Sequence, residues 1–298
     1  DGTARSTLNL TGTRYSTRRN YAQFTSIDDM LSAMRFDVVD VVVPTYLHHD
    51  YSIKVLQSGT NCLCEKPMAL SVEDCKEMIE ASEKSNKLLM TGHCLRFWRE
   101  YAWLYDAIKC EHFGKVLGAY FTRGGYAGLE TNPSWHNWII DASLGGGALF
   151  DQHIHDTDFI LWAFGKPAEV HTMGKKYFPR SANDIVSTQY IYDDKVITAL
   201  DDISYRALPF EYGFTVNLEK AAVTYRENML TVYPETGEKF RPDLTVYGDG
   251  DAYYNEIKYF LSCVAQGERP DRCDVHDSLA TIGLVRLEEQ NAAKNARQ

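Results

Sequence analysis

The stretch that decides the fold is DVVDVVVPTYLHHDYSIKVLQSGTNCLCEKP, residues 37–67. It begins with the mostly β-branched run Val38–Val43, which ends at Pro44. Apolar runs of this length are typical of strands buried on both faces of a parallel sheet. Residues 48–58 then predict a helix, and residues 61–64 predict a second strand. A strand, a helix and a strand in this order form a right-handed βαβ unit.

The same alternation continues on both sides of this unit. Residues 26–31 resemble a short capped helix, and Ser71 is a good N-cap for a long one. Residues 88–90 predict a third strand, which stops at Gly92. We therefore predict that residues 1–92 form an α/β, Rossmann-type dinucleotide-binding domain with a parallel sheet, incomplete at its N-terminus.

The second half of the chain has a different pattern. Strand candidates with short turns between them lie at 115–123, 168–178, 185–193, 195–203, 211–218 and 220–225. Helices are predicted at about 147–164, at about 253–264 and after Asp277, and the first two stop at Gly165 and Gly267. Residues 93–298 are thus expected to be an α+β domain with a large, mostly antiparallel open sheet.

Composition excludes several classes of protein. The 298 residues carry a net charge of -10, which argues against a nucleic-acid partner, because phosphate binding needs clustered positive charge. No apolar run approaches the ~20 residues that span a bilayer. Seven irregularly spaced cysteines fit reduced thiols better than a disulfide framework, and Cys62-x-Cys64 is not the usual zinc spacing. We expect a cytoplasmic protein without a membrane partner and without a bound metal.

The first candidate site is Cys64-Glu65-Lys66-Pro67, directly after a predicted strand. Active sites of open parallel sheets lie outside the carboxyl ends of their strands, so a lysine there can point into a cleft. The alternative is a surface turn with a solvated lysine.

The second candidate follows Gly145-Gly146-Gly147. On a helix, Asp151, His155 and Asp158 share one face, and a carboxylate beside an imidazole forms an acid–base pair in which the carboxylate raises the proton affinity of the ring. His155 could instead be a packing histidine. A metal site built from Asp151, His153, His155 and Asp156 would need a strand here, because on a helix the two rings diverge by about 200°.

Other segments are weaker signals. The turn from Val43 to His48 and the segment Gly92–Phe97 each follow a predicted strand. Arg96 could either line the cleft or form a salt bridge across the domain boundary. Trp135, His136 and Trp138 could cap a sugar pocket or belong to the core.

In this order, the features resemble the Gfo/Idh/MocA family, named for glucose–fructose oxidoreductase and inositol dehydrogenase. The resemblance covers residues from about 21 to 290. It is carried by Pro44 with His48 four residues later, by Glu65-Lys66-Pro67, by Gly92-x-x-x-Arg96-Phe97, and by the triple glycine with Asp151-x-x-x-His155-Asp156-x-Asp158.

The resemblance implies an enzyme that transfers a hydride between NAD or NADP and a secondary alcohol or ketone of a sugar or cyclitol. It implies a catalytic group of Lys66, Asp151 and His155, and a cofactor lining of Pro44, Thr45, His48, Glu65 and Lys66. Arg96, Trp135 and His136, with Lys66 and His155, are the expected substrate contacts. A homodimer or homotetramer formed through the C-terminal sheet is also implied.

The chain departs from the family pattern in two ways. A Gly-x-Gly-x-x-Gly turn is absent from the sequence, so we expect that segment to precede these residues in the real protein, with Asp1 near the end of the second strand. Val43 and Thr45 stand where many members have Thr and Asn. Two other functions stay open: a non-catalytic sensor of the same fold, and a glycosidase that uses NAD without net redox change.

Overall fold

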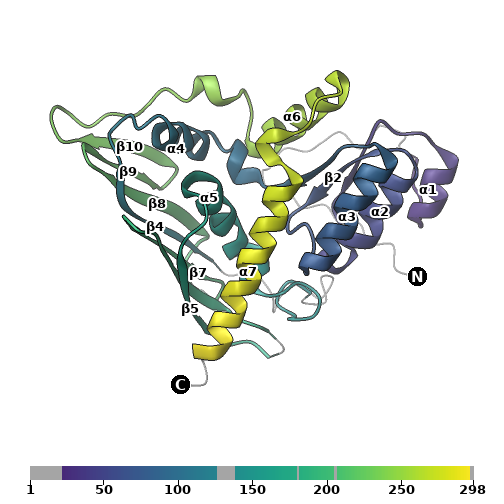
Figure 1. The fold of residues 1–298 in the computed structure, drawn as a ribbon, viewed down its shortest axis with the longest axis horizontal. Helices are drawn as coiled ribbons and strands as arrows, with labels where there is room; N and C mark the ends of the chain where they lie inside the picture. Colours follow the sequence, from purple (N-terminus) through teal and green to yellow (C-terminus); the bar gives the residue numbers. More distant parts are fainter. Residues whose placement is uncertain (1–21, 126–137, 180, 205–206, 296–298) are drawn as a thin grey trace.

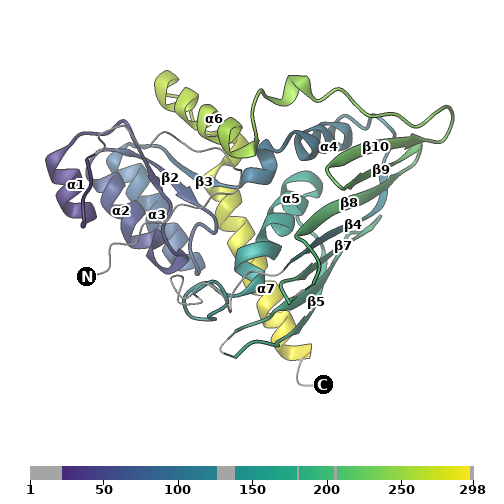
Figure 2. The same ribbon diagram turned by 180° about the vertical axis from the view of Figure 1, so that it is seen from behind.

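The computed structural model describes residues 22–125, 138–179, 181–204 and 207–295. A small sheet and a large sheet lie at opposite ends of the molecule, with helices between them (Figure 1; Figure 2). The strands are β1 Val38–Val41, β2 Asn61–Glu65, β3 Leu89–Gly92, β4 Val116–Gly124, β5 Glu169–Lys175, β6 Ile185–Ile191, β7 Val196–Asp202, β8 Glu211–Leu218, β9 Ala221–Arg226 and β10 Met229–Pro234. The helices are α1 Ile27–Ala33, α2 His48–Gln57, α3 Val72–Ser85, α4 Arg99–Lys109, α5 Ile154–Phe164, α6 Ala252–Gln266 and α7 Val275–Asn295. Five shorter helical turns complete the described chain: η1 Thr45–Leu47, η2 Cys94–Phe97, the π-helical η4 Leu149–His153, η5 Thr245–Tyr247 and η6 Asp271–Cys273.

The small sheet is parallel throughout, in the order β1-β2-β3. Its helix boundaries follow from local chemistry: the Ser71 side chain accepts a hydrogen bond from the Asp74 N–H at the start of α3, and Asn86 ends the helix in the left-handed conformation. The predicted Rossmann-type parallel sheet is confirmed. Because the strands run in parallel, the segments that follow them meet at one edge.

The large sheet has the order β10-β9-β8-β4-β7-β6-β5. Its strands pair in antiparallel fashion except β4 and β7, which are parallel. The prediction of a mostly antiparallel sheet is therefore confirmed. The parallel pair arises because the chain leaves the sheet after β4, forms α5, and returns at the far edge before β7.

Two elements were not predicted from the sequence. Strand β10 pairs with β9 across a two-residue turn in which Glu227 and Asn228 have φ of 50° and 59°. Two successive positive φ angles are typical of hairpin turns, but such turns usually contain glycine, and Glu-Asn lacks that signal. Helix α4 is the second element that was not predicted. It is rich in aromatic residues, and these also favour strands, so the sequence did not indicate a helix.

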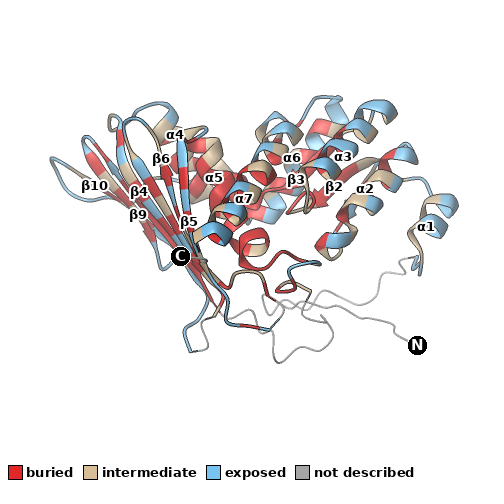
Figure 3. Cartoon of the chain, turned by 60° about the horizontal axis from the view of Figure 1, so that its bottom comes forward, coloured by how far each residue is buried: buried red, intermediate tan, exposed pale blue. Residues whose placement is uncertain are grey.

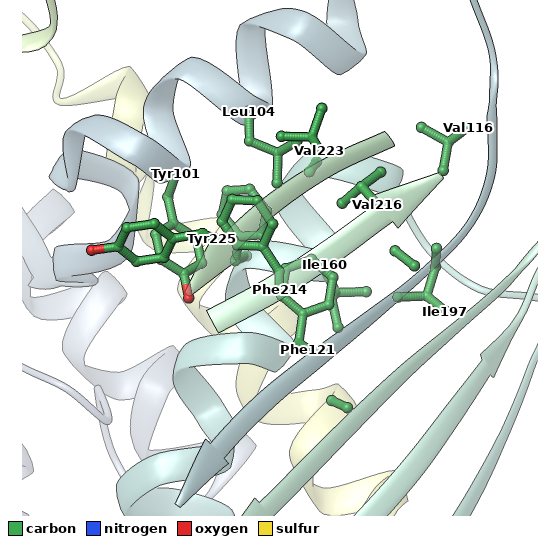
Figure 4. Packing of buried hydrophobic residues seen from close by; sticks show 14 of the residues in the cluster. Tyr101, Leu104, Val116, Phe121, Ile160, Ile197, Phe214, Val216, Val223 and Tyr225 are labelled. Carbon is green, nitrogen blue, oxygen red and sulfur yellow. The ribbon is translucent and has the colours of Figure 1, made fainter. Parts of the chain in front are cut away.

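One face of the large sheet carries the core. Aromatic and aliphatic residues of α4, α5 and strands β4, β8 and β9 interlock there, with Tyr101 packed edge-on against Phe159 and Phe214 (Figure 4). Burial alternates along the strands, and the opposite face is open (Figure 3). Helix α7 contacts β5 and α5 at one end and α3 at the other, so it connects the two sheets. Among the described residues, no helix is long and apolar enough to cross a membrane.

Candidate active site

The site forms where the two halves of the chain meet. Lys66 follows β2, and Asp151 lies in η4, 85 residues further along the chain. The Lys66 Nζ atom donates to the Asp151 backbone oxygen at 2.6 Å and lies 3.0 Å from its Oδ1. Both side chains are mostly buried, with 17% and 24% of their surfaces exposed. The alternative of a solvated surface lysine is therefore excluded.

The triple glycine shapes the entry to this helix. Gly146 and Gly147 have φ of 78° and 69°, which residues with a side chain rarely adopt. A Cβ at Gly145 would lie 2.3 Å from the Trp138 backbone oxygen. The chain then enters a π-helical turn, a feature often found at functional sites, before α5 continues to the predicted end at Gly165.

His155 lies in the first turn of α5 and is partly buried. Its Nδ1 atom is 3.9 Å from the Cys94 Sγ. Burial lowers the pKa of His155 well below its ordinary value, and the positive charges of Lys66 and Arg123 lower this pKa further. The imidazole is consequently neutral at pH 7.

The predicted pairing of Asp151 with His155 is wrong in its electrostatics. Within the described ranges, no hydrogen bond joins the two residues, and the Asp151 carboxylate pairs with Lys66 instead. His155 faces cations, so its proton affinity is lowered where a carboxylate partner would have raised it. Asp151 lies in the π-helical turn, and His155 lies in the α-helix that follows it.

The other polar residues of this segment have separate partners. Asp156 accepts hydrogen bonds from the guanidinium of Arg123 at 3.1 and 3.2 Å. His153 is fully buried, with its Nδ1 2.5 Å from Asp201 Oδ2. The residues of the alternative metal site therefore diverge to different surroundings, as a helix requires. Among the described residues, no group of three or more metal-binding side chains converges.

Arg96 forms salt bridges, but its partners Asp158 and Asp277 lie with it in the predicted 93–298 domain, so the pairs do not cross the predicted domain boundary. It is only 1% exposed, and its Nε and NH2 atoms donate to the two carboxylate oxygens of Asp158 at 2.9 and 2.8 Å. Its NH1 atom donates to Asp277 at 2.8 Å. The guanidinium thus joins η2 to α5 and to α7, and its donors are engaged within the protein. The expectation of a substrate contact from Arg96 is corrected accordingly.

The predicted cofactor residues gather at the carboxyl edge of the small sheet. Thr45 and His48 are buried in the turn that follows β1. Glu65 ends β2, and its carboxylate accepts a hydrogen bond from the Lys66 N–H at 3.1 Å. Burial raises the pKa of Glu65. Trp135 and His136 lie outside the described residues.

The same edge also carries exposed apolar side chains. Two large apolar side chains stand exposed at the end of β1, Val42 at 66% and Tyr46 at 46%. Exposed apolar side chains of this kind are surfaces against which a flat ring can pack. Pro44, Thr45, Glu65 and Lys66, which are the residues expected to line a cofactor, lie in and beside the turns at this edge.

Three residues of the site were not predicted from the sequence. Arg123 occupies an inward-facing position on β4, two residues after the buried Phe121. A charge at such a position signals a buried partner, here Asp156. Glu256 lies on the buried face of α6, and its Oε1 atom is beside Gly92. Cys94 gave no signal, because its nearness to His155 depends on the packing of η2 against α5.

A small parallel sheet joined to a large mixed sheet, with lysine, aspartate and histidine between them, is the arrangement expected from the family that the sequence resembles. Residues 11–93 match the model of an oxidoreductase family with an NAD-binding Rossmann fold, and residues 101–249 match the GFO/IDH/MocA C-terminal domain. The chain belongs to the Gfo/Idh/MocA family.

Several relatives are similar to the chain. An uncharacterized oxidoreductase of Streptococcus pneumoniae is 35% identical over 87% of this chain and 66% of its own length. The 2,7-anhydro-N-acetylneuraminate hydratase of Escherichia coli is 26% identical over 83% of this chain and 62% of its own length. The scyllo-inositol 2-dehydrogenase of Bacillus subtilis is 27% identical over 90% and 78%. The chain thus spans just under two thirds of the first two relatives.

The fold also matches solved structures. Levoglucosan dehydrogenase in complex with NADH and levoglucosan superposes with a TM-score of 0.79, covering 91% of this chain and 82% of that one. At 18% identity, the likeness establishes a shared fold.

Proposed function

We propose that this protein is an NAD- or NADP-dependent oxidoreductase that acts on a secondary alcohol, or the matching ketone, of a sugar-like or cyclitol-like substrate. The observation that carries the proposal is the contact between Lys66 and Asp151. Asp151 lies four residues before His155, whose lowered pKa keeps its ring neutral. The Lys66 ammonium, the Asp151 carboxylate that binds it, and the His155 imidazole thus form a group at the edge where we expect the nicotinamide to bind. The names of the relatives, a cyclitol dehydrogenase among them, support the same substrate class.

Each residue of the site has a separate role in the proposed hydride transfer. A bound nicotinamide would supply the hydride acceptor. The Nδ1 atom of His155 lies 3.9 Å from the Cys94 sulfur, which leaves Nε2 to accept the hydroxyl proton of the substrate. The Lys66 ammonium stabilises the developing alkoxide, and Asp151 holds that ammonium in place. In the reduction direction, His155 returns the proton.

Replacement of the two central residues tests this assignment. Lys66→Ala and His155→Ala should each lower kcat by roughly 10²–10⁴, because acid–base and charge stabilisation are lost while the cofactor edge persists. Turnover is followed by nicotinamide absorbance with a panel of sugars and cyclitols. Near-wild-type turnover in both variants would refute the assignment.

The same assay separates the alternatives. One relative is named a hydratase, so the panel includes an anhydrosugar, and products are analysed with and without net NADH formation. Product release without net NADH would favour a redox-neutral reaction such as that of an NAD-dependent glycosidase. Cofactor binding without any turnover would favour a sensor.

We also propose that the open face of the large sheet joins two or more copies of the chain. Tyr120, Val196 and Leu200 stand on this face with 42%, 44% and 39% of their surfaces exposed. Light scattering after size-exclusion chromatography should give a dimer or tetramer, and Val196→Asp with Leu200→Asp should shift it towards monomer. A wild-type monomer would contradict the proposal.

A further inference from the structure

His48 has an arrangement that a cofactor contact does not require. Its Nδ1 atom is 2.7 Å from the backbone oxygen of Pro67, and its Nε2 atom is 2.8 Å from that of Val43. The residue is 1% exposed. Both ring nitrogens are therefore directed at the protein backbone, and neither is left to contact a ligand.

The two backbone oxygens belong to different loops. Val43 lies in the turn after β1, and Pro67 directly follows Lys66 in the turn after β2. The imidazole thus spans the carboxyl ends of two neighbouring strands. A neutral ring donates a hydrogen bond to one of these oxygens and packs against the other without a hydrogen bond, whereas a protonated ring donates to both.

The position of Lys66 depends on the second loop. Its ammonium must reach both the backbone oxygen and the carboxylate of Asp151, at 2.6 and 3.0 Å. The strand before it is fixed by its pairing with β1 and β3, but the turn after it lies beyond the last paired residue, Glu65. His48 is the side chain that holds this turn from the side of β1.

We propose that His48 is a positioning residue, which staples the turn after β1 to the turn that carries Lys66 and so holds the Lys66 ammonium against Asp151. It acts through Lys66 and does not touch the cofactor or the substrate. This inference rests on the proposed function for its kinetic consequence, but its structural consequence can be measured without turnover.

The chain offers matched variants. His48→Asn and His48→Gln each keep an amide group near one ring nitrogen, so each retains at most one end of the staple and is less disruptive than alanine. His49→Asn is the control, because His49 is the next residue of the same helix and binds Asp50 and Glu77 at the surface. Lys54, with a side chain 43% exposed, serves as an internal reference for lysine reactivity.

The first measurement is the rate of reductive methylation of Lys66 relative to Lys54, followed by peptide mass spectrometry on the full-length protein. Loss of the staple should free the ammonium and raise the Lys66 rate by up to about tenfold in both His48 variants. His49→Asn should leave the rate unchanged. An unchanged Lys66 rate in folded His48 variants would overturn the proposal.

The second measurement is a double-mutant cycle on kcat. His48→Gln should lower kcat by about 10- to 100-fold, with the NADH dissociation constant changed by less than about twofold, because the reacting group is displaced while the cofactor surface persists. In a Lys66→Ala background it should have no further effect. Equal losses in both backgrounds, or weaker NADH binding with kcat preserved, would overturn the proposal. A wild-type protein without turnover would instead count against the proposed function, and the methylation result would still decide the role of His48.

Discussion

The charges around His155 determine what that residue can do. A histidine beside a carboxylate is a stronger base, but burial lowers the pKa of this one, and the nearby Lys66, Arg123 and His93 lower that pKa further. A low pKa keeps the ring unprotonated and ready to accept a proton over most of the physiological range. Burial and the nearby positive charges thus favour the unprotonated form of His155.

This leads to a pH prediction. In alcohol oxidation kcat/KM should fall only below the ordinary histidine pKa of about 6.5, since the ring must be neutral to act as a base. Lys66→Met removes one of the charges that lower the pKa of His155, so the acidic limb of the profile should move to higher pH. Kinetics from about pH 5 to 9 test this, with Lys54→Met as a surface control. An acidic limb at the same pH in wild type and Lys66→Met would contradict the electrostatic account.

Sequence reasoning located Lys66, Asp151 and His155 but not the contacts among them. Residue spacing places Asp151 and His155 near one another on a helix, yet it does not distinguish an α-helical from a π-helical turn. In the structure Asp151 lies in a π-helical turn, and its carboxylate contacts Lys66. Arg96 shows the same limit, because its buried pair with Asp158 depends on packing between segments 62 residues apart.

At the scale of elements, helix α5 is anchored by a buried polar network behind the site. His153 contacts Asp201 on β7 and Thr188 on β6. Glu288 of α7 accepts a hydrogen bond from Tyr190 at 2.7 Å and lies 3.4 Å from His153. Because every one of these groups is buried, the network fixes the start of α5 against the large sheet.

The network should make stability depend on pH. Asp201 and Glu288 raise the pKa of His153 from 6.5 to about 9 against the opposing effect of burial. A group with a raised folded-state pKa stabilises fully below its unfolded value and loses that contribution as pH rises through the folded one. Wild-type unfolding free energy should therefore decline between pH 6.5 and about 9, by on the order of 1–3 kcal/mol.

Urea unfolding of wild type and His153→Asn measures this decline. The variant should be less stable at pH 6.5, and its stability should vary less across the window. His171→Asn, on the exposed side of β5, is the control. A wild type that gains stability from pH 6.5 to 9, or a variant with the same slope, would show that His153 does not carry the proton.

Sequence signals were most reliable for elements with local causes. Ser71, Gly165 and Gly267 marked helix ends that the structure confirms. The β9–β10 hairpin was not predicted because Glu227 and Asn228 adopt positive φ without glycine. The parallel pairing of β4 with β7 has no local signal, since it joins two strands that are separated in the chain by α5, β5 and β6.

At the scale of the whole molecule, the site depends on how the two sheets are held together. Arg96 joins η2 to α5 and α7, and Arg286 of α7 donates to the Leu70 backbone oxygen while stacking over Phe150. These contacts connect the Lys66 turn, the π-helical turn and the last helix. Arg96, which the sequence offered as a cleft candidate, therefore helps to hold the segments around the site in place.

The measurement that tests the central claim most directly is a fluorescence titration of the full-length protein with NADH and with NADPH. The account predicts saturable binding of at least one of the two, with nicotinamide emission enhanced by the apolar edge near Val42 and Tyr46. Tyr46→Asp, which places a charge on that edge, should weaken the binding. An absence of saturable binding by folded protein with either cofactor would contradict the account, and the Lys66–Asp151–His155 arrangement would then need another explanation.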